Sequence, residues 1–545
     1  MGDAIRVRPF VLVALVFLLA VLAAAGALLL RARGDDETVI PAALSTYVEA
    51  VPGTWQRVNP LFASENPVDQ DLVALLFNGL VRIGDHGVVE PDLAEALPAV
   101  GPDGRTYTFR LREGLRWHDG EPVTSSDVLF TIDQITAPGF RGPTETAAAW
   151  SEIVVDFVDD RTVEFTLPEP SAPFLARVAG TPILPRHLLE GLSPQQLEQA
   201  PFNSKPVGTG PYRVSSLSAT EANLRANQSY HLGRPRIEQV RLRFFSDHTS
   251  ALRAFQDGEV DGLFVAEPRA FGDAAIAVPD TNIVTSIRFR YDIIYLNNSQ
   301  ADLFRDGQVR RALSLALDRA ELVRDVYNGF ATASASPVTP GSWAYFPEYD
   351  ATALALNQAE SLLDEAGWLR HPSTGIRTRE GAEFRITIRT DDDPGRVALG
   401  RAIASQLDRV GIKATVASTT FTVLRRDFLQ ERLYEVAIVS WDQGADPDPY
   451  FGWHSSQLGA AGLNIANFTN GSADLLIEEA RQSTDGEWRL EMYRQFQEIW
   501  ETTAPSLVVA YPTYIYAFAA SVRPVIDETL QSPGARFSNI HLWTN

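Results

Sequence analysis

Eight histidines, many carboxylates and one aromatic, acidic segment are the residues of this sequence that could do chemistry. No two histidines have the spacing of a helical metal site; they stand at positions 86, 118, 187, 231, 248, 371, 454 and 541. Carboxylates crowd at Asp391–Asp393 and at Asp446 and Asp448, but 69 acidic residues make chance pairs common. The sequence also lacks a Gly-x-Ser-x-Gly elbow and a Gly-x-Gly-x-x-Gly turn after a strand. These patterns favour a protein that is not an enzyme.

The segment that follows a predicted strand at 436–440 is better suited to binding. It contains Trp441, Asp442, Gln443 and Tyr450, so aromatic faces and a carboxylate lie within ten residues. A buried ligand needs aromatic walls and a few placed charges, and this segment offers both. The alternative interpretation of Trp441 is ordinary core packing.

Length, charge and cysteine content limit the class of protein. With 545 residues the chain is long enough for two or three hydrophobic cores. The net charge of −22 argues against a nucleic-acid partner, which would require a basic surface. The sequence has no cysteine, which excludes disulfides, thiolate metal sites, a cysteine nucleophile and lipid attachment through an N-terminal cysteine.

A long apolar run near the N-terminus predicts a membrane segment. Residues 10–30 form an unbroken apolar stretch of 21 residues, which is long enough to span a bilayer as a helix. We predict an uncleaved anchor with residues 1–9 in the cytoplasm, residues 31–42 as a linker and the remainder extracytoplasmic. The alternative is a secretory signal cleaved near Ala23–Ala25, which would release the protein.

The segment Gly104–Asp127 predicts a strand, two turns and a capped helix. Tyr107, Phe109 and Leu111 alternate with polar residues, as in a half-buried strand. Thr124 stands three residues before Asp127, which is the spacing of a capping box at a helix start.

Other elements follow from the same periodicities. We predict a helix with an apolar stripe from Val309 to Ala320. The segments 384–389, 397–410 and 412–417 read as strand, helix and strand, and such a crossover implies parallel strands.

Three of these blocks resemble one protein family, the bacterial extracellular solute-binding proteins of family 5. This family comprises dipeptide-, oligopeptide- and nickel-binding proteins of ABC transporters. Gly104–Asp127 resembles its Tyr-Thr-Phe strand, aromatic-His-Asp-Gly turn and Asp-Val helix start. Pro206–Tyr212, with the sequence Pro-Val-Gly-Thr-Gly-Pro-Tyr, is similar to the family's return from an inserted domain. The helix at Val309–Leu313 with Asp318-Arg319 is similar to a third family block.

The resemblance implies a two-lobed α/β fold of the periplasmic-binding-protein type II with an extra inserted domain. One predicted N-terminal transmembrane helix precedes this fold in the sequence. The expected domain boundaries are lobe I at 40–75, 203–288 and 512–545, an inserted domain II at 76–202, and lobe III at 289–511.

The resemblance also implies a function and site residues. The expected role is the extracytoplasmic substrate-binding component of an ABC importer. It would capture peptides or similar small solutes by hinge closure and deliver them to a permease, as a monomer without a cofactor. The alternatives are a membrane-anchored sensor or scaffold with the same fold, and an extracytoplasmic hydrolase.

Individual site residues carry over with one departure. Trp441 matches the family's tryptophan, but Gly444 stands where peptide-binding members have an aspartate for the ligand's α-ammonium group. Two alternatives follow: Asp442 supplies this carboxylate after a local shift, or the role is absent from this chain. Arg389 lies where dipeptide-binding relatives keep an arginine for a ligand carboxylate, and an arginine fork suits that task. Glu49, in the opening Glu-Ala-x-Pro turn, is a further candidate.

Overall fold

A computed structural model describes residues 45–265, 281–299 and 303–545. The predicted membrane segment at 10–30 lies outside these residues. In the part of the chain that is described, no helix is long and apolar enough to cross a membrane. Residues 46–545 pack as one unit.

A large mixed sheet organises this unit. It is built from strands whose inward residues are mostly aromatic or β-branched, which suits a buried pleated surface. In spatial order, its strands are β19 (Lys413–Thr419), β18 (Arg385–Asp391), β20 (Val436–Asp442), β13 (Arg290–Leu296), β21 (Ser506–Ala519), β11 (Gly262–Val265), β1 (Thr46–Pro52), β10 (Gln239–Phe245), β9 (Glu221–Ala226) and β8 (Tyr212–Leu217). Beside this path lie β12 (Thr281–Arg288), β14 (Ala331–Ala333) and β22 (Thr529–Leu530).

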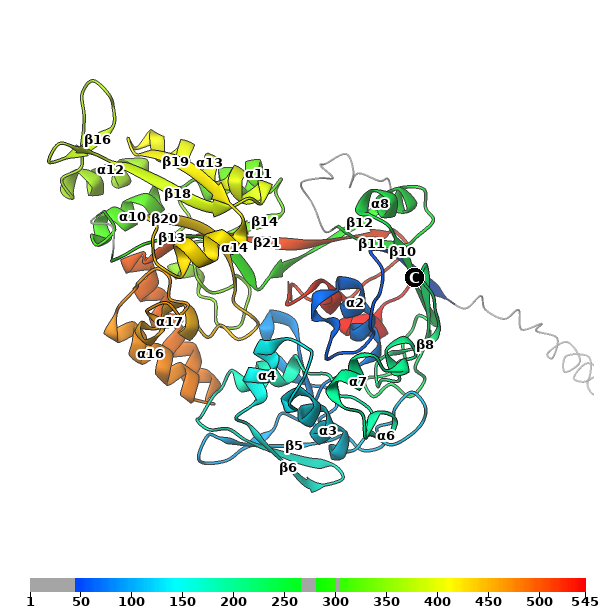
Figure 1. Cartoon of the computed structure of the whole chain (residues 1–545). Coiled ribbons are helices and arrows are strands. Elements are labelled where there is room, and N and C mark those ends of the chain that lie inside the picture. The colour runs from blue at the N-terminus through cyan, green and yellow to red at the C-terminus, as the bar shows by residue number, and fades with distance from the viewer. Residues whose placement is uncertain (1–44, 266–280, 300–302) are drawn as a thin grey trace, which may run out of the picture. The chain divides into compact units, whose positions relative to one another are not determined.

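One strand, β21, joins the two halves of this sheet (Figure 1). Its first part, Ser506–Ala510, pairs with β13. Its second part, Thr513–Ala519, pairs with β12. Only Phe289 separates β12 from β13, so the two strands accompany β21 from one half to the other. The register between β13 and β21 shifts next to Asp292, which marks an irregularity at this crossing.

The β-α-β unit predicted near residue 400 is present. β18 and β19 pair in parallel, and α13 (Pro394–Arg409) connects them. Leu399, Ile403 and Leu407 of α13 are buried in a core that also contains sheet residues. The helix predicted from Val309 to Ala320 is instead two helices, α10 (Gly307–Leu315) and α11 (Arg319–Val326). The break occurs because the Asp318 carboxylate accepts the Glu321 backbone N–H and starts a new helix.

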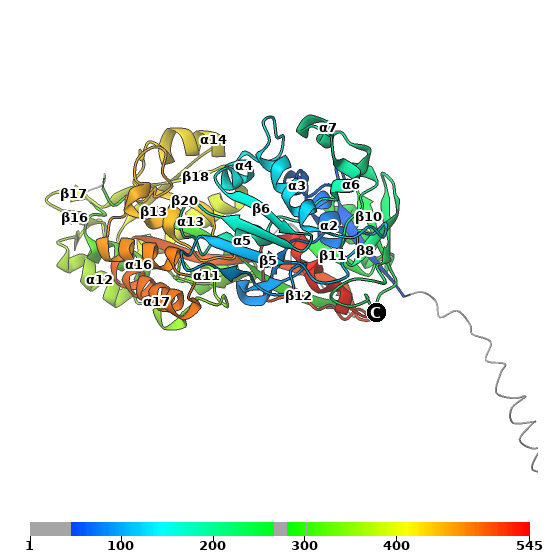
Figure 2. The ribbon, with the colours of Figure 1, turned by 90° about the horizontal axis from the view of Figure 1, so that it is seen from below.

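The segment Gly104–Asp127 folds as predicted, within a separate antiparallel sheet. This sheet has the order β4 (Ala99–Val100), β5 (Thr106–Arg110), β7 (Thr162–Thr166) and β6 (Val154–Asp159). Tyr107 and Phe109 of β5 are fully buried. The capping box of Thr124 and Asp127 starts α3 (Ser125–Thr136), which packs against β6 and β7 (Figure 2).

The remaining elements surround these sheets. The helices are α2 (Pro67–Leu76), α4 (Thr144–Trp150), α5 (Phe174–Ala179), α6 (Arg186–Leu189), α7 (Pro194–Glu198), α8 (His248–Gln256), α12 (Leu356–Glu365), α14 (Phe421–Val423), α15 (Tyr450–Trp453), α16 (Gly471–Gln482) and α17 (Gly486–Thr503). Two small sheets consist of β2 (Val81–Ile83) with β3 (Val89–Pro91), and of β15 (Leu369–Arg370), β16 (Arg377–Arg379) and β17 (Ala382–Glu383).

Candidate functional site

Trp441 and Asp442 belong to a strand and not to the loop that the sequence suggested. β20 continues through Asp442 because β13 offers backbone partners as far as Arg290. Trp441 stands opposite Tyr291 in this pairing and packs, partly buried, on an aromatic core. A Cβ atom added to Gly452 would lie 3.0 Å from the Trp441 ring, so the indole is also covered from α15.

Asp442 points its carboxylate into an open position. Its side chain is 78% exposed, and its Oδ2 atom lies 3.8 Å from a guanidinium nitrogen of Arg290. The Arg290 side chain is itself 42% exposed. An exposed pair at this distance contributes little to stability and leaves both groups accessible to a ligand.

Gln443 has a structural set of partners. Its Oε1 atom accepts hydrogen bonds from the backbone N–H and the hydroxyl of Thr339, at 3.1 and 2.7 Å. Its Nε2 atom donates to the Pro337 carbonyl at 2.8 Å. The side chain therefore fastens the end of β20 to the segment 337–339.

Arg389 and Tyr450 lie around the same aromatic core as Trp441. The guanidinium carbon of Arg389 is 3.8 Å from the centre of the Phe428 ring. Phe428, Trp441 and Tyr450 all pack, partly buried, on this core. The Tyr450 ring carries Arg481 at 4.2 Å on one face and stacks on His454. The structure thus brings three of the predicted residues to one core, although Tyr450 is engaged by protein groups.

Glu49 lies elsewhere, in a buried ion cluster. It is 1% exposed, and its carboxylate accepts hydrogen bonds from Arg536 at 2.9 Å and from the Tyr47 hydroxyl at 2.7 Å. Arg536 also binds Asp71 at 2.7 Å. Burial raises the pKa of Glu49, and the Arg536 charge opposes this effect. All nearby donors are already committed, so the carboxylate has a structural environment.

Arg288, which the sequence reasoning missed, lies at the end of β12. Its guanidinium carbon is 4.3 Å from the centre of the Tyr514 ring. Tyr514 in turn contacts Phe264, with ring centroids 5.9 Å apart. Burial lowers the pKa of Arg288 below its usual value. The signal available in the sequence was the Arg-Phe-Arg triplet at 288–290, directly before the strand that leads into Tyr295-Leu296-Asn297.

The strands β12, β13, β20 and β21 are joined by backbone pairing in this region. Four of their residues lie near one another, and we call them the hinge cluster: Arg288, Arg290, Asp442 and Tyr514. Burial raises the pKa of the Tyr514 hydroxyl. The charge of Arg288 lowers this pKa and the charge of Asp442 raises it, so both charges lie near the hydroxyl. Two cations, one anion and an aromatic face suit a polar ligand with an anionic group.

Residues 88–462 match the family described as bacterial extracellular solute-binding proteins, family 5, middle region. The chain belongs to this family. Family 5 proteins bind solutes and are not enzymes, and they are extracytoplasmic, either periplasmic or attached to the surface.

Two known proteins have sequences similar to that of this family 5 chain. Protein XP55 of Streptomyces lividans is 31% identical over 433 residues, covering 78% of this chain and 76% of that protein. The oligopeptide-binding protein AppA of Bacillus subtilis is 27% identical over 466 residues, covering 83% and 84%. A solved structure of AppA with a nonapeptide has a TM-score of 0.64 at 25% identity, covering 92% of this chain and 98% of that one.

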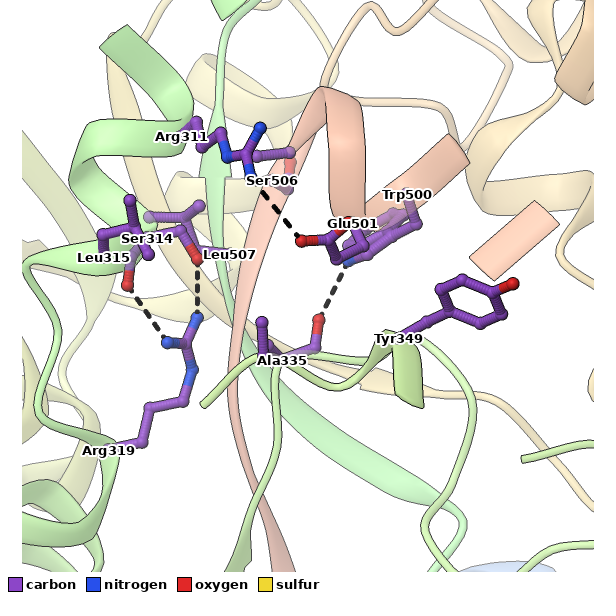
Figure 3. A pocket seen from close by; sticks show the side chains of 12 residues that line it. Arg311, Ser314, Leu315, Arg319, Ala335, Tyr349, Trp500, Glu501, Ser506 and Leu507 are labelled. Atoms are coloured by element: carbon purple, nitrogen blue, oxygen red, sulfur yellow. Dashed lines mark hydrogen bonds and ion pairs between the residues drawn. The ribbon is translucent and has the colours of Figure 1, made fainter. Parts of the chain in front are cut away.

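The cavity beside Arg311, Arg319 and Trp500 is too small for a ligand. The cavity in Figure 3 has a volume of about 30 Å³ and lies beside Arg311, Arg319 and Trp500. It has room for about two water molecules, whereas ligand pockets usually exceed about 300 Å³. Arg319 donates to the Val508 and Ser314 carbonyls, and burial lowers its pKa to about 10. It therefore supports the backbone of this family 5 chain.

Within residues 45–265, 281–299 and 303–545, no group of three or more histidine or acidic side chains could hold a metal ion.

Proposed function

We propose that this protein is the extracytoplasmic substrate-binding component of an ABC importer and that its ligands are peptides or similar small solutes. The hinge cluster is the observation that carries the proposal, because it gathers accessible charges of both signs beside the strands that connect the two halves of the sheet. Ligand contacts at such a junction favour a closed form that a permease recognises.

The proposed architecture follows the expected division. Lobe I comprises 40–75, 203–288 and 512–545, domain II comprises 76–202, and lobe III comprises 289–511. The pairing of β21 with strands from both lobes is compatible with a hinge near residues 288–292 and 510–513. We further propose that residues 10–30 anchor the protein in the membrane and that it works as a monomer.

Aromatic contacts and charges have separate roles in this proposal. Trp441 forms part of the wall, Asp442 receives a cationic group such as a peptide α-ammonium, and Arg389 or a second arginine receives an anionic group. Gln443 and Tyr450 support these positions through the protein contacts described above, whereas Glu49 belongs to the separate ion cluster with Arg536.

Ligand-induced stabilisation of the full chain in detergent tests the proposal. Mixtures of random tripeptides and nonapeptides, nickel–histidine chelates and maltooligosaccharides would be screened by thermal unfolding. A ligand at 100 times its Kd stabilises the native state by about 2.7 kcal/mol, so a peptide mixture is expected to raise Tm. If no mixture raises Tm and native mass spectrometry finds no co-purified ligand, the proposed function is wrong.

A further inference from the structure

Arg288 has no ion-pair or side-chain hydrogen-bond partner among the residues that the structure describes. Its Nε atom is buried and has no hydrogen-bond partner. No carboxylate of the described residues lies within ion-pair distance of its guanidinium group, which lies over the Tyr514 ring. Neighbouring arginines differ: Arg290 faces Asp442, and Arg396 binds Asp391 through two hydrogen bonds of 2.6 and 2.7 Å.

This lack of partners is informative because acids are abundant in the chain. There are 69 acidic residues and only 47 lysines and arginines. Arg536, which is fully buried, is matched by two carboxylates. A buried donor without a partner destabilises the folded protein, so such groups usually serve something absent from the protein itself.

We propose that Arg288 binds an anionic group of the ligand, which in a peptide is a carboxylate. This inference rests on the proposed function and assigns the anion-binding position to the hinge. The Tyr514 ring lies against one face of the guanidinium group and fixes its plane. The edge of that plane presents N–H groups in the fork geometry that a carboxylate accepts.

The location gives this contact a second role. Arg288 is the last residue of β12 and belongs to the strands of proposed lobe I, whereas Arg290 and Asp442 belong to strands of proposed lobe III. An anion at Arg288 therefore lies beside charges from both sides of the hinge. Its binding energy would favour the arrangement in which these groups are close together.

The competing position is Arg389, which lies over Phe428 and likewise has no ion pair with a described residue. The two arginines make a matched pair for the test, since each rests on one aromatic ring. The experiment compares the full-length wild type in detergent with Arg288→Gln, Arg288→Lys, Arg389→Gln and, as a control, Arg253→Gln on the exposed side of α8. The probes are random tripeptides as free acids and the same mixture as C-terminal amides.

We expect the wild type to prefer the free acids. Arg288→Gln should weaken free-acid binding about 10- to 100-fold, because one charge-assisted contact is lost, and leave amide binding unchanged. Arg288→Lys should retain part of the preference, which also shows that the site tolerates substitution at this position. Arg253→Gln should bind as the wild type does.

Three results would overturn the inference. Free-acid preference that persists in both Arg288 variants would exclude this residue, and loss of the preference in Arg389→Gln alone would assign the role to Arg389. Denaturant unfolding of Arg288→Gln distinguishes lost binding from lost folding. If the wild type binds neither free acids nor amides, the peptide function itself fails, and the assignment of Arg288 fails with it.

Discussion

Glu49 and Arg288 are both charged, but their surroundings in this protein differ. Glu49 is surrounded by donors from Tyr47 and Arg536, so its charge is satisfied inside the protein. Arg288 lies against an aromatic ring and has no carboxylate of the described residues within ion-pair distance. Burial with a full set of partners indicates a structural role, whereas an unpaired charge at a junction indicates an external partner.

The structural role of Glu49 could not have been predicted from the sequence. Arg536 is 487 residues away from Glu49, and no local pattern reports a contact of that range. The alternation that predicts β20 likewise does not say where the strand ends, because its last pairs depend on Arg290 and Tyr291 of β13. What the sequence could predict at this scale was the capping box of Thr124 and Asp127, which is a purely local arrangement.

His118 predicts a pH-dependent stability. Burial lowers its pKa to about 4, from an ordinary value near 6.5. The neutral ring accepts the Gly208 N–H at Nδ1, at 3.2 Å, and donates from Nε2 to the Gly210 carbonyl at 3.0 Å. Because the folded-state pKa is depressed, the stabilisation is complete above pH 6.5 and is lost as the pH falls through 4.

The variant His118→Asn cannot titrate at this position. The difference in unfolding free energy between wild type and variant should therefore shrink by about 3 kcal/mol between pH 7 and pH 4. Denaturant titrations at several pH values measure this difference, in which the other titrating groups cancel. A difference that stays constant with pH would show that the pKa of His118 is the same in the folded and the unfolded protein, so that burial does not lower it.

At the scale of elements, the turn at Pro206–Tyr212 is held by backbone contact with α2. The Gly210 N–H donates to the Leu76 carbonyl at 2.9 Å. A Cβ atom on Gly208 would lie 1.8 Å from the same carbonyl oxygen, so a side chain there would force α2 and β8 apart. The sequence indicated a tight glycine turn, but α2 as its contact required the structure.

Gly208→Ala should therefore destabilise the protein by more than about 3 kcal/mol, because rigid backbone on both sides must move. The matched control is Gly471→Ala at the start of α16, where an added Cβ atom meets nothing within 4 Å. That change should be neutral or slightly stabilising, since it reduces the freedom of the unfolded chain. Chemical denaturation of both variants measures the contrast; equal effects would contradict this account of the turn.

At the scale of the whole molecule, the short segment 85–87 of proposed domain II contacts proposed lobe III. The Trp343 N–H donates to the His86 carbonyl at 2.9 Å, and a ring nitrogen of His86 lies 2.6 Å from the Gly341 carbonyl oxygen. A Cβ atom on Gly87 would lie 2.9 Å from the Ala445 carbonyl oxygen and 3.0 Å from the Phe289 ring. These contacts are close and depend on the absence of a side chain at Gly87.

Gly87→Ala should weaken these contacts and shift the protein towards a more open form. Small-angle X-ray scattering of the full chain in detergent, with the detergent contribution matched out, should then show a larger radius of gyration than for the wild type. Gly114→Ala is the control, because Gly114 has nearly the same φ, +73° against +75°, but open space around it. If both variants scatter alike, backbone strain and not the contact explains the effect.

The central position of β21 means that the large sheet can be completed only late in synthesis of the chain. The sheet order puts this strand between β13 and β11, although it comes from residues 506–519 near the end of the chain. A ribosome adding about 5–20 residues per second needs roughly 25 to 100 s to reach it. Until then both neighbouring strands lack a partner along one edge, and the sheet stays divided. Residues that are synthesised late thus complete the sheet, so the sheet stays incomplete until synthesis of the chain is almost finished.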